Sequence, residues 1–89
     1  MEKRFVHKVP GGKLLKVRLD YASGVINSLR INGDFFAHPE DAIERLESML
    51  SGRALSEIDS IINDFVKTGV VLYGIAASDI AYAIREASK

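Results

Sequence analysis

The sequence predicts an α+β fold in which a three-stranded antiparallel β-meander packs against three helices as a two-layer sandwich. Apolar residues alternate with polar ones over residues 2–36, which is the period of a sheet with one buried face. After Phe36 the apolar spacing changes to three and four residues, which is typical of amphipathic helices that cover such a face. Residues 1–89 contain no repeat and no linker, so we expect a single domain.

Two turns separate the three predicted strands. Pro10-Gly11-Gly12 ends the first strand, because proline fixes φ and glycine accepts positive φ at little cost. Ala22-Ser23-Gly24 joins the second strand to the third. The residues assigned to the buried face are Phe5, His7, Val9, Leu15, Val17, Leu19, Tyr21, Val25, Leu29, Ile31 and Phe35.

Two helices are expected in the next part of the chain. The first begins at Pro39, which suits the first helical position, and Gly52 stops it. The second begins near Ser56, where Ser56 and Asp59 resemble a capping box, and ends at Gly69. Their apolar stripes are Ala42, Ile43, Leu46, Met49 and Leu50, and Leu55, Ile58, Ile61, Ile62 and Phe65.

The last part of the chain combines an apolar connector with a third helix. Residues 70–75 fit either a short strand or a buried loop, because periodicity does not separate the two in so short a run. Ser78 is expected to cap the helix that follows. Its apolar stripe is Ile80, Ala81, Ala83 and Ile84.

Few residues are suited to catalysis. The chain has no cysteine, which excludes disulfides, a thiolate nucleophile and a thiolate metal site. The two histidines are His7 and His38. We interpret His7 as a packing residue, because it shares a strand face with Phe5 and Val9, and His38 as a possible cap of the helix at Pro39. We therefore expect no catalytic residue and no metal site on this chain.

The charges are balanced in number and uneven in position. Twelve basic residues match twelve acidic ones, with residues 1–20 mainly basic and residues 34–64 mainly acidic. Such asymmetry is typical of a docking surface, although solvated side chains explain any single charge. With zero net charge we expect no nucleic-acid partner. The basic side chains assigned to the exposed sheet face are Lys8, Lys16, Arg18 and Arg30.

No targeting signal or membrane segment is evident. No apolar run approaches the roughly 20 residues that a membrane-spanning helix needs. The N-terminus, Met1 to Phe5, is charged and lacks the apolar stretch of a signal peptide. We therefore expect a cytoplasmic protein without a membrane partner.

Two short segments are more specific. The turn Pro10-Gly11-Gly12-Lys13 resembles a phosphate loop, but it lacks the Walker spacing and leads into a strand. Lys13 at its tip is in a position to reach a ligand held by a partner. In Asn32-Gly33-Asp34-Phe35-Phe36, Asp34 is suited to hold a turn through backbone amides. The adjacent phenylalanines point to opposite faces, so one enters the core while the other covers the far side or meets a partner.

These segments carry a resemblance to a known family. The relevant runs are Lys8-Val9-Pro10-Gly11-Gly12-Lys13-Leu14, Ile31-Asn32-Gly33-Asp34-Phe35-Phe36, Pro39-Glu40-Asp41, the helix end Leu46, Leu50 and Gly52, and Gly74-Ile75 with Ser78-Asp79-Ile80-Ala81, Ala83 and Ile84. Together they resemble the C-terminal accessory domain of lipoate–protein ligases over nearly the whole chain. The Gly-Asp-Phe-Phe block followed by Pro-Glu is the most specific part.

The resemblance implies a division of labour between two proteins. In this family a large domain binds lipoate, ATP and magnesium, makes lipoyl-AMP and passes the lipoyl group to a lysine of an acceptor. The acceptors are the lipoyl domains of 2-oxoacid dehydrogenases and the glycine-cleavage H protein. Because this chain starts with its own methionine and contains only the small part, we expect a non-catalytic accessory subunit that forms a heterodimer with a large catalytic subunit.

The same resemblance extends to fold and to site residues. The small domain resembles the iron–sulphur scaffold and sulphur-acceptor proteins in fold, although a chain without cysteine cannot share their chemistry. Two alternatives are a free-standing module that binds an acidic protein through the basic sheet face, and a self-associating structural domain. The candidates for residues at the partner interface or near its ligand are Gly11, Gly12, Lys13, Asp34, Phe35 and Phe36.

Overall fold

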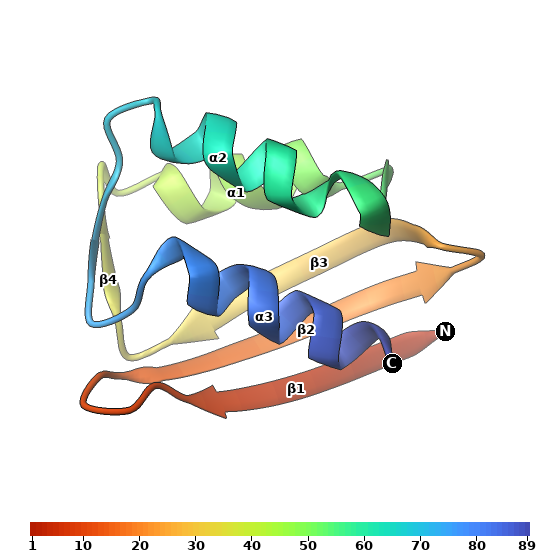
Figure 1. The fold of residues 1–89 in the computed structure, drawn as a ribbon, viewed down its shortest axis with the longest axis horizontal. Helices are drawn as coiled ribbons and strands as arrows, with labels where there is room; N and C mark the ends of the chain where they lie inside the picture. The colour runs from red at the N-terminus through yellow and green to blue at the C-terminus, as the bar shows by residue number, and fades with distance from the viewer.

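A computed structural model describes all of residues 1–89 and confirms the predicted α+β fold (Figure 1). Its strands are β1 (Glu2–Lys8), β2 (Leu14–Ala22), β3 (Val25–Gly33), β4 (Phe36–His38), β5 (Arg53–Ala54) and β6 (Val71–Tyr73). Its helices are α1 (Ala42–Leu50), the 3₁₀ turn η1 (Leu55–Glu57), α2 (Ile58–Val66) and α3 (Ala77–Ser88). The predicted meander is β1, β2 and β3. The short strand β5 is added to it beside β3, and β4 and β6 form a separate two-stranded sheet.

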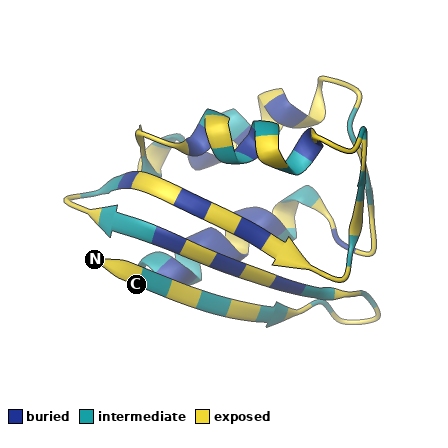
Figure 2. Ribbon diagram, turned by 180° about the vertical axis from the view of Figure 1, so that it is seen from behind, coloured by how far each residue is buried: buried dark blue, intermediate teal, exposed yellow.

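The main sheet has the order β1-β2-β3-β5, with every neighbouring pair antiparallel. Buried and exposed residues alternate along β2 and β3 (Figure 2). The register shifts near Asp20 and Tyr21, which leaves Asn27 as the extra residue of a β-bulge. The bulge puts Ile26 in the core and leaves Val25 only partly buried, so the prediction of Val25 on the buried face was wrong by one residue.

The helices form the second layer. Helix α3 packs on β1 and β2, α1 packs beside β3, and α2 contacts both of the other helices (Figure 1). The predicted apolar stripes supply most of the core between the layers. Its buried residues are Leu15, Val17, Leu19, Ile26, Leu29, Ile31, Ala42, Leu46, Leu50, Ile58, Ile62, Phe65, Ile75, Ile80, Ala81, Ala83, Ile84 and Ala87.

The first helix starts later than predicted. Pro39 lies in a turn, and its carbonyl accepts a hydrogen bond of 2.9 Å from the Ala42 amide. Helix α1 begins only at Ala42. Pro39 is therefore not the first helical residue. His38 belongs to β4, so its predicted role as a helix cap was also wrong. His38 pairs with Val71 across β4 and β6, and Pro39 follows it in the turn. The strand pairing therefore outweighs the local preference for a helix start.

The caps of the other two helices also differ from the prediction. The Glu57 carboxylate accepts a hydrogen bond of 2.9 Å from the Ala54 amide, so Ser56 and Asp59 do not form the expected capping box. The Asp79 carboxylate accepts one of 2.8 Å from the Ala76 amide, and Ser78 lies inside the first turn of α3. In both places an acidic side chain reaches back from the first turn to an unpaired amide, where the helix dipole also favours its charge.

Residues 70–75 are resolved as a strand followed by a loop. In this segment β6 pairs antiparallel with β4 at one end of the molecule (Figure 1). The two chain termini lie together at the opposite end, where the Lys3 ammonium donates a hydrogen bond of 2.9 Å to the Lys89 carbonyl. None of the helices is both long and apolar enough to cross a membrane.

Candidate partner-binding site

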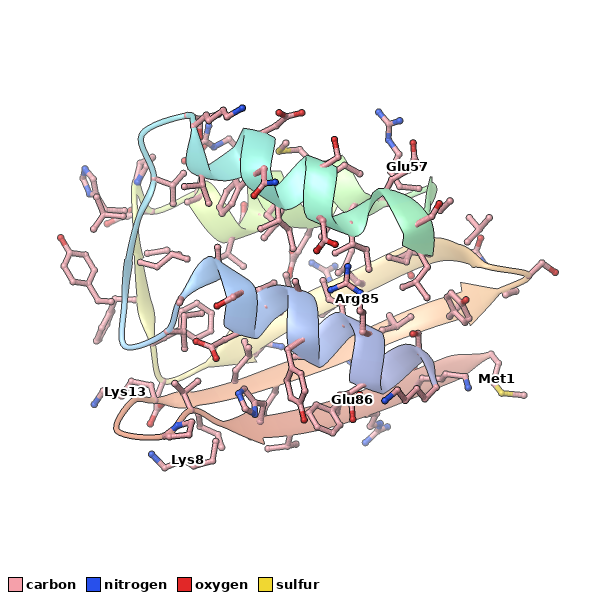
Figure 3. All side chains as sticks on the ribbon, viewed as in Figure 1. Met1, Lys8, Lys13, Glu57, Arg85 and Glu86 are labelled. Atoms are coloured by element: carbon pink, nitrogen blue, oxygen red, sulfur yellow. The ribbon has the colours of Figure 1, made fainter.

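The turn between β1 and β2 is closed by its own backbone. The Gly12 amide donates a hydrogen bond of 2.8 Å to the Val9 carbonyl, and the Val9 amide donates one of 3.1 Å to the Lys13 carbonyl. The Lys8 ammonium adds a third contact, 2.7 Å from the Gly12 carbonyl oxygen. Gly11 has a φ of +70°, a conformation that other residues adopt only with strain. Lys8, at the end of β1, and Lys13, in the turn, both lie at this end of the molecule (Figure 3).

The same turn is fixed to the loop before α3. The Lys13 amide donates a hydrogen bond of 2.9 Å to the Gly74 carbonyl. A side chain on Gly12 would collide with that carbonyl oxygen, and one on Gly74 would collide with the stem of Lys13. Two glycines thus permit an approach between segments that lie far apart in the sequence. The turn is therefore held at a set position relative to β6.

Asp34 ties the end of β3 to the start of β2. Its carboxylate accepts a hydrogen bond of 2.7 Å from the Leu14 amide, and its own amide donates one of 3.3 Å to the Leu14 carbonyl. A side chain on Gly33 would collide with that carbonyl oxygen. The prediction that Asp34 holds a turn through backbone amides is confirmed. Asp34 is thus a structural link between the end of β3 and the start of β2.

The two adjacent phenylalanines have different environments. Phe35 is partly buried against the core, whereas Phe36 is 71% exposed. The sequence prediction that one enters the core and the other leaves it is confirmed. Phe36 pairs directly with Tyr73 across the small sheet, and Tyr73 is 56% exposed. Residues that lie directly opposite in such a pair point to the same face, so both rings face outward.

The outward face of β4 and β6 is an exposed apolar surface. We define the aromatic patch as Phe36, His38, Val71 and Tyr73, which are all exposed and form two cross-strand pairs. The intervening pair, Ala37 and Leu72, is partly buried against the core. A groove of about 340 Å³ adjoins the patch. The apolar residues that line the groove are Ile31, Phe35, Phe36, Ala37 and Ile43.

The structure brings the predicted site residues to one end of the molecule. Gly12 and Lys13 contact the loop at Gly74, which follows β6, while Phe36 lies on the neighbouring strand β4. Asp34 is tied to Leu14, the residue after Lys13. Sequence reasoning missed the contribution of β6. The available signal was the aromatic residue next to a glycine in the apolar connector 70–75.

The histidines have unlike surroundings. His7 is partly buried, its ring centroid lies 4.9 Å from that of Tyr82, and its Nε2 is 3.4 Å from an Asp79 carboxylate oxygen. The prediction of a packing histidine is confirmed. His38 is exposed in the aromatic patch. No group of three or more His, Cys, Asp or Glu side chains is arranged to hold a metal ion.

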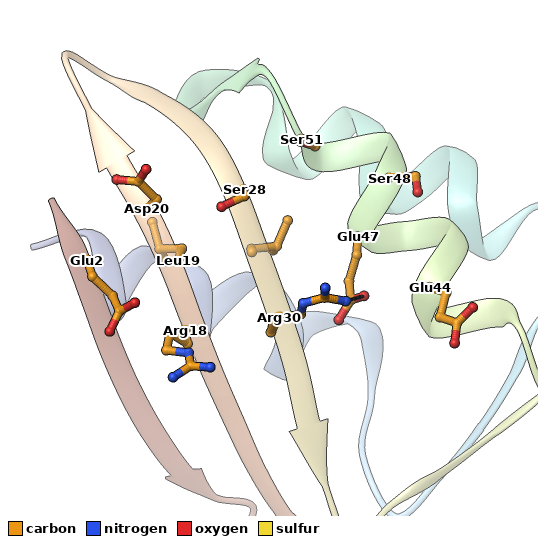
Figure 4. A pocket seen from close by; sticks show the side chains of 11 residues that line it. Glu2, Arg18, Leu19, Asp20, Ser28, Arg30, Glu44, Glu47, Ser48 and Ser51 are labelled. Carbon is orange, nitrogen blue, oxygen red and sulfur yellow. Dashed lines mark ion pairs between the residues drawn. The ribbon is translucent and has the colours of Figure 1, made fainter.

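The basic sheet face lies on the side of the sheet away from the helices. Lys8, Lys16, Arg18 and Arg30 are all exposed there, as predicted. A groove of about 550 Å³ runs along this face between the strands and α1 (Figure 4). It is lined mainly by charged and hydroxyl side chains. The molecule therefore presents two unlike surfaces, an apolar one at the end of the sheet and a basic one across its outer face.

Comparison with known proteins identifies the family. Residues 1–84 match the model described as the bacterial lipoate protein ligase C-terminus. Lipoate-protein ligase A subunit 2 of Thermoplasma acidophilum is 43% identical over 72 residues, which are 81% of this chain and 77% of that protein. A chain from the solved structure of a bi-partite lipoate protein ligase and its E2 lipoyl domain, from the same organism, has a TM-score of 0.80 and 36% identity, with 93% of this chain and 96% of that chain covered. This chain therefore belongs to the family of bacterial lipoate protein ligase C-terminal domains.

Proposed function

We propose that this chain is the accessory, non-catalytic subunit of a two-chain lipoate–protein ligase and acts in a heterodimer with a large catalytic subunit. The observation that carries the proposal is similarity over nearly the full length of both chains to a protein from a bi-partite ligase, 93% of this chain and 96% of the other. The 43% identical relative is itself described as a second subunit. Residues 1–89 then act as one accessory domain.

The chemistry in this proposal belongs to the partner. Lipoate, ATP and magnesium bind to the large subunit, which forms lipoyl-AMP and transfers the lipoyl group to a lysine of a lipoyl-domain acceptor. This chain supplies no catalytic side chain to either step. The proposed location is the cytoplasm, where ATP and newly made acceptor domains are both present.

The aromatic patch is the proposed contact with the large subunit. Phe and Tyr are enriched at protein interfaces because their rings bury a large area while few torsions have to be fixed. Phe36 and Tyr73 form a cross-strand pair that is already ordered by the pairing of β4 with β6. Lys13, at the edge of the same end, extends toward the partner and can approach its negatively charged ligand. Gly11, Gly12 and Asp34 act indirectly, by holding that end in shape.

The mechanism we propose is preorganisation. The small subunit docks beside the active site of the large one and orders the loops that hold ATP and lipoate. Ordering of this kind lowers the activation barrier of adenylation by several kcal/mol without any added catalytic group. The subunit then moves so that the acceptor can enter.

The test is lipoyl-AMP formation, followed by pyrophosphate release, with the large subunit from the same organism. We expect the reaction to appear or accelerate strongly only when this chain is added. The double variant Phe36→Ala/Tyr73→Ala, which lacks the two rings of the proposed contact, should restore little of the rate at equal concentration. An unchanged rate on adding the wild-type chain, together with no binding between the two proteins, would contradict the proposal and favour the free-standing binding module.

A further inference from the structure

The outer face of the main sheet contains an unusual arrangement of charge. The register pairs Arg4 with Arg18 and Arg18 with Arg30, so three arginines lie directly opposite one another on three consecutive strands. All three side chains are on the exposed side of the sheet. We call this set the arginine row. Like charges directly opposite on a sheet repel one another, so the row lowers the stability of the free subunit.

The arginine row is only partly neutralised within the chain. Arg4 lies 3.3 Å from a Glu2 carboxylate oxygen, and Arg30 lies 3.6 Å from one of Glu47 on α1. Arg18, in the centre, takes part in none of the ion pairs of the structure. Figure 4 shows Arg18 and Arg30 on neighbouring strands, with Glu47 on the adjacent helix. The central guanidinium is thus available to an external carboxylate, which it can bind through two parallel hydrogen bonds.

The basic surface continues from the row to the turn end of the molecule. Lys16 is exposed on β2, two residues from Arg18, and Lys8 is exposed at the end of β1. The Lys8 ammonium contacts the Gly12 carbonyl in the turn, next to Lys13. The cations therefore form a track that ends beside the proposed contact with the large subunit. A partner held on this track would lie close to that subunit.

The surrounding carboxylates indicate a protein partner over a nucleic acid. Glu2 and Asp20 are paired across the sheet in the row next to the arginines. Glu44 and Glu47 line the same groove from α1. A uniform polyanion laid across this face would meet repulsion on two sides of the row. A folded protein that carries a compact acidic segment among other side chains fits the alternation of charge.

We infer that the arginine row and the lysines beside it bind an acidic surface of the acceptor domain and guide it to the large subunit. This inference rests on the proposed function. Acceptor domains must bind and leave in every turnover, and small, polar, electrostatically complementary interfaces suit such transient contacts. The aromatic patch suits the lasting contact within the ligase. The two partners would then occupy different surfaces of this small subunit.

The test uses the assembled ligase of both subunits and the lipoyl domain from the same organism. The variant is Arg18→Glu, and the matched control is Lys67→Glu, which makes the same charge change at an exposed residue at the end of α2. Three quantities are measured on the ligase: the dissociation constant of the two subunits, the rate of lipoyl-AMP formation, and kcat/KM for transfer to the lipoyl domain at several salt concentrations. Binding of a single-stranded oligonucleotide is measured beside them.

We expect Arg18→Glu to lower kcat/KM for transfer by about tenfold or more at low salt, mainly through KM, because the lost interaction is with the acceptor. The deficit should shrink as salt rises, since the contact is exposed and screened. Subunit affinity and lipoyl-AMP formation should stay at the wild-type values, as should all three quantities for Lys67→Glu.

Three results would overturn the inference. Transfer that is unchanged by Arg18→Glu would remove the row from acceptor binding. A loss of subunit affinity would assign this face to the large subunit. A loss of binding to a single-stranded oligonucleotide, with transfer unchanged, would favour a nucleic acid. Failure of the proposed function is recognised separately, because the wild-type pair itself would then form no lipoyl-AMP.

Discussion

The aromatic patch and the arginine row differ in how their side chains are supported. Phe36 and Tyr73 lie on the strand pair of β4 and β6. Backbone hydrogen bonds from the Lys13 amide to the Gly74 carbonyl and from the Asp34 amide to the Leu14 carbonyl hold the neighbouring segments in place. Arg4, Arg18 and Arg30 project from the middle of the main sheet on long side chains with few partners. The first surface is apolar and is supported by strand pairing, whereas the second is charged and consists of long side chains with few partners within the chain.

The difference indicates two kinds of contact. Rigid aromatic side chains lose little conformational entropy on binding and bury much apolar area, which gives lasting affinity. Long charged side chains add less to affinity and more to the rate and selectivity of encounter. The comparison therefore predicts that changes at the two surfaces affect different measurements.

Removing both rings of the aromatic patch should give the largest effect. We expect Phe36→Ala/Tyr73→Ala to weaken binding to the large subunit by about 100-fold, roughly 2.7 kcal/mol, as for other aromatic hot spots. The fold should be affected little, because both rings are largely exposed. Calorimetric titration measures the affinity, and thermal unfolding checks the fold. Unchanged affinity would leave the patch without its proposed role.

The anchoring of the turn end can be tested through one glycine. In Gly74→Ala the new methyl group meets Lys13 and the residue is also held at a φ of +91°, so we expect a loss of roughly 2–3 kcal/mol in the free energy of unfolding. Gly24→Ala is the control, because Gly24 has a φ of +78° with open space around it. It should cost about 1 kcal/mol. Equal losses in denaturant titrations would mean that the packing on Lys13 adds no stability.

Lys13 connects the two surfaces, since it ends the basic track beside the aromatic patch. We expect Lys13→Ala to lower the rate of lipoyl-AMP formation by the mixed subunits by about tenfold, as for the loss of one charge-assisted hydrogen bond. Lys67→Ala serves as the control at an exposed lysine. A wild-type rate in Lys13→Ala would remove this side chain from the mechanism, whatever the role of the turn backbone.

The arginine row should show an opposition between stability and function. We expect Arg18→Gln to raise the free energy of unfolding of the isolated subunit by roughly 0.5 kcal/mol, because it removes repulsion between directly opposed charges. The same variant should lower kcat/KM for transfer to the lipoyl domain. Urea unfolding at low and high salt measures the first effect, which should fade at high salt. A loss of stability would mean that Arg18 has a stabilising partner within the chain.

A paired arginine provides the smallest effect and the contrast to Arg18. Arg85 on α3 donates a hydrogen bond to the Asp59 carboxylate on α2 (Figure 3). This contact lowers the pKa of Asp59 from its ordinary 3.8 and raises the pKa of Arg85. Because the pKa of Asp59 is lower in the folded state, the pair stabilises the fold above pH 3.8 and loses that contribution as the pH falls through the lowered value. Asp59→Asn should therefore reduce the melting temperature slightly near pH 7, and the difference should vanish in acid. A difference that persists in acid would have another cause.

Much of the fold follows from local sequence patterns. The alternation in β2 and the stripes of α1, α2 and α3 predict most of the buried residues of these elements, because a strand repeats every two residues and a helix every 3.6. Five residues assigned to these faces are only partly buried: Tyr21, Ile43, Met49, Leu55 and Ile61. The resemblance to lipoate–protein ligases is confirmed by the family match over residues 1–84. The likeness to the iron–sulphur scaffold fold stays a prediction.

The incorrect predictions concern residues at which a helix or strand begins or ends. Pro39 carries a strong local signal for a helix start, yet the pairing of β4 with β6 keeps His38 extended and delays α1 to Ala42. Ser78 has the side chain of a cap, but Asp79 reaches the free amide of Ala76. In each case several local solutions are close in energy, and contacts with other parts of the chain select one.

The layer architecture, most of the buried faces and the family can be predicted from the sequence, since each depends on periodic burial or on motifs carried by neighbouring residues. The sequence also named Gly12, Lys13, Asp34 and Phe36 as candidates. Two features become visible only in the three-dimensional structure: β6 completes the aromatic patch, and Arg4, Arg18 and Arg30 form one row. Both features depend on the register between strands, which hydrogen bonds and the bulge at Asn27 set across segments distant in the chain, and no local pattern encodes it.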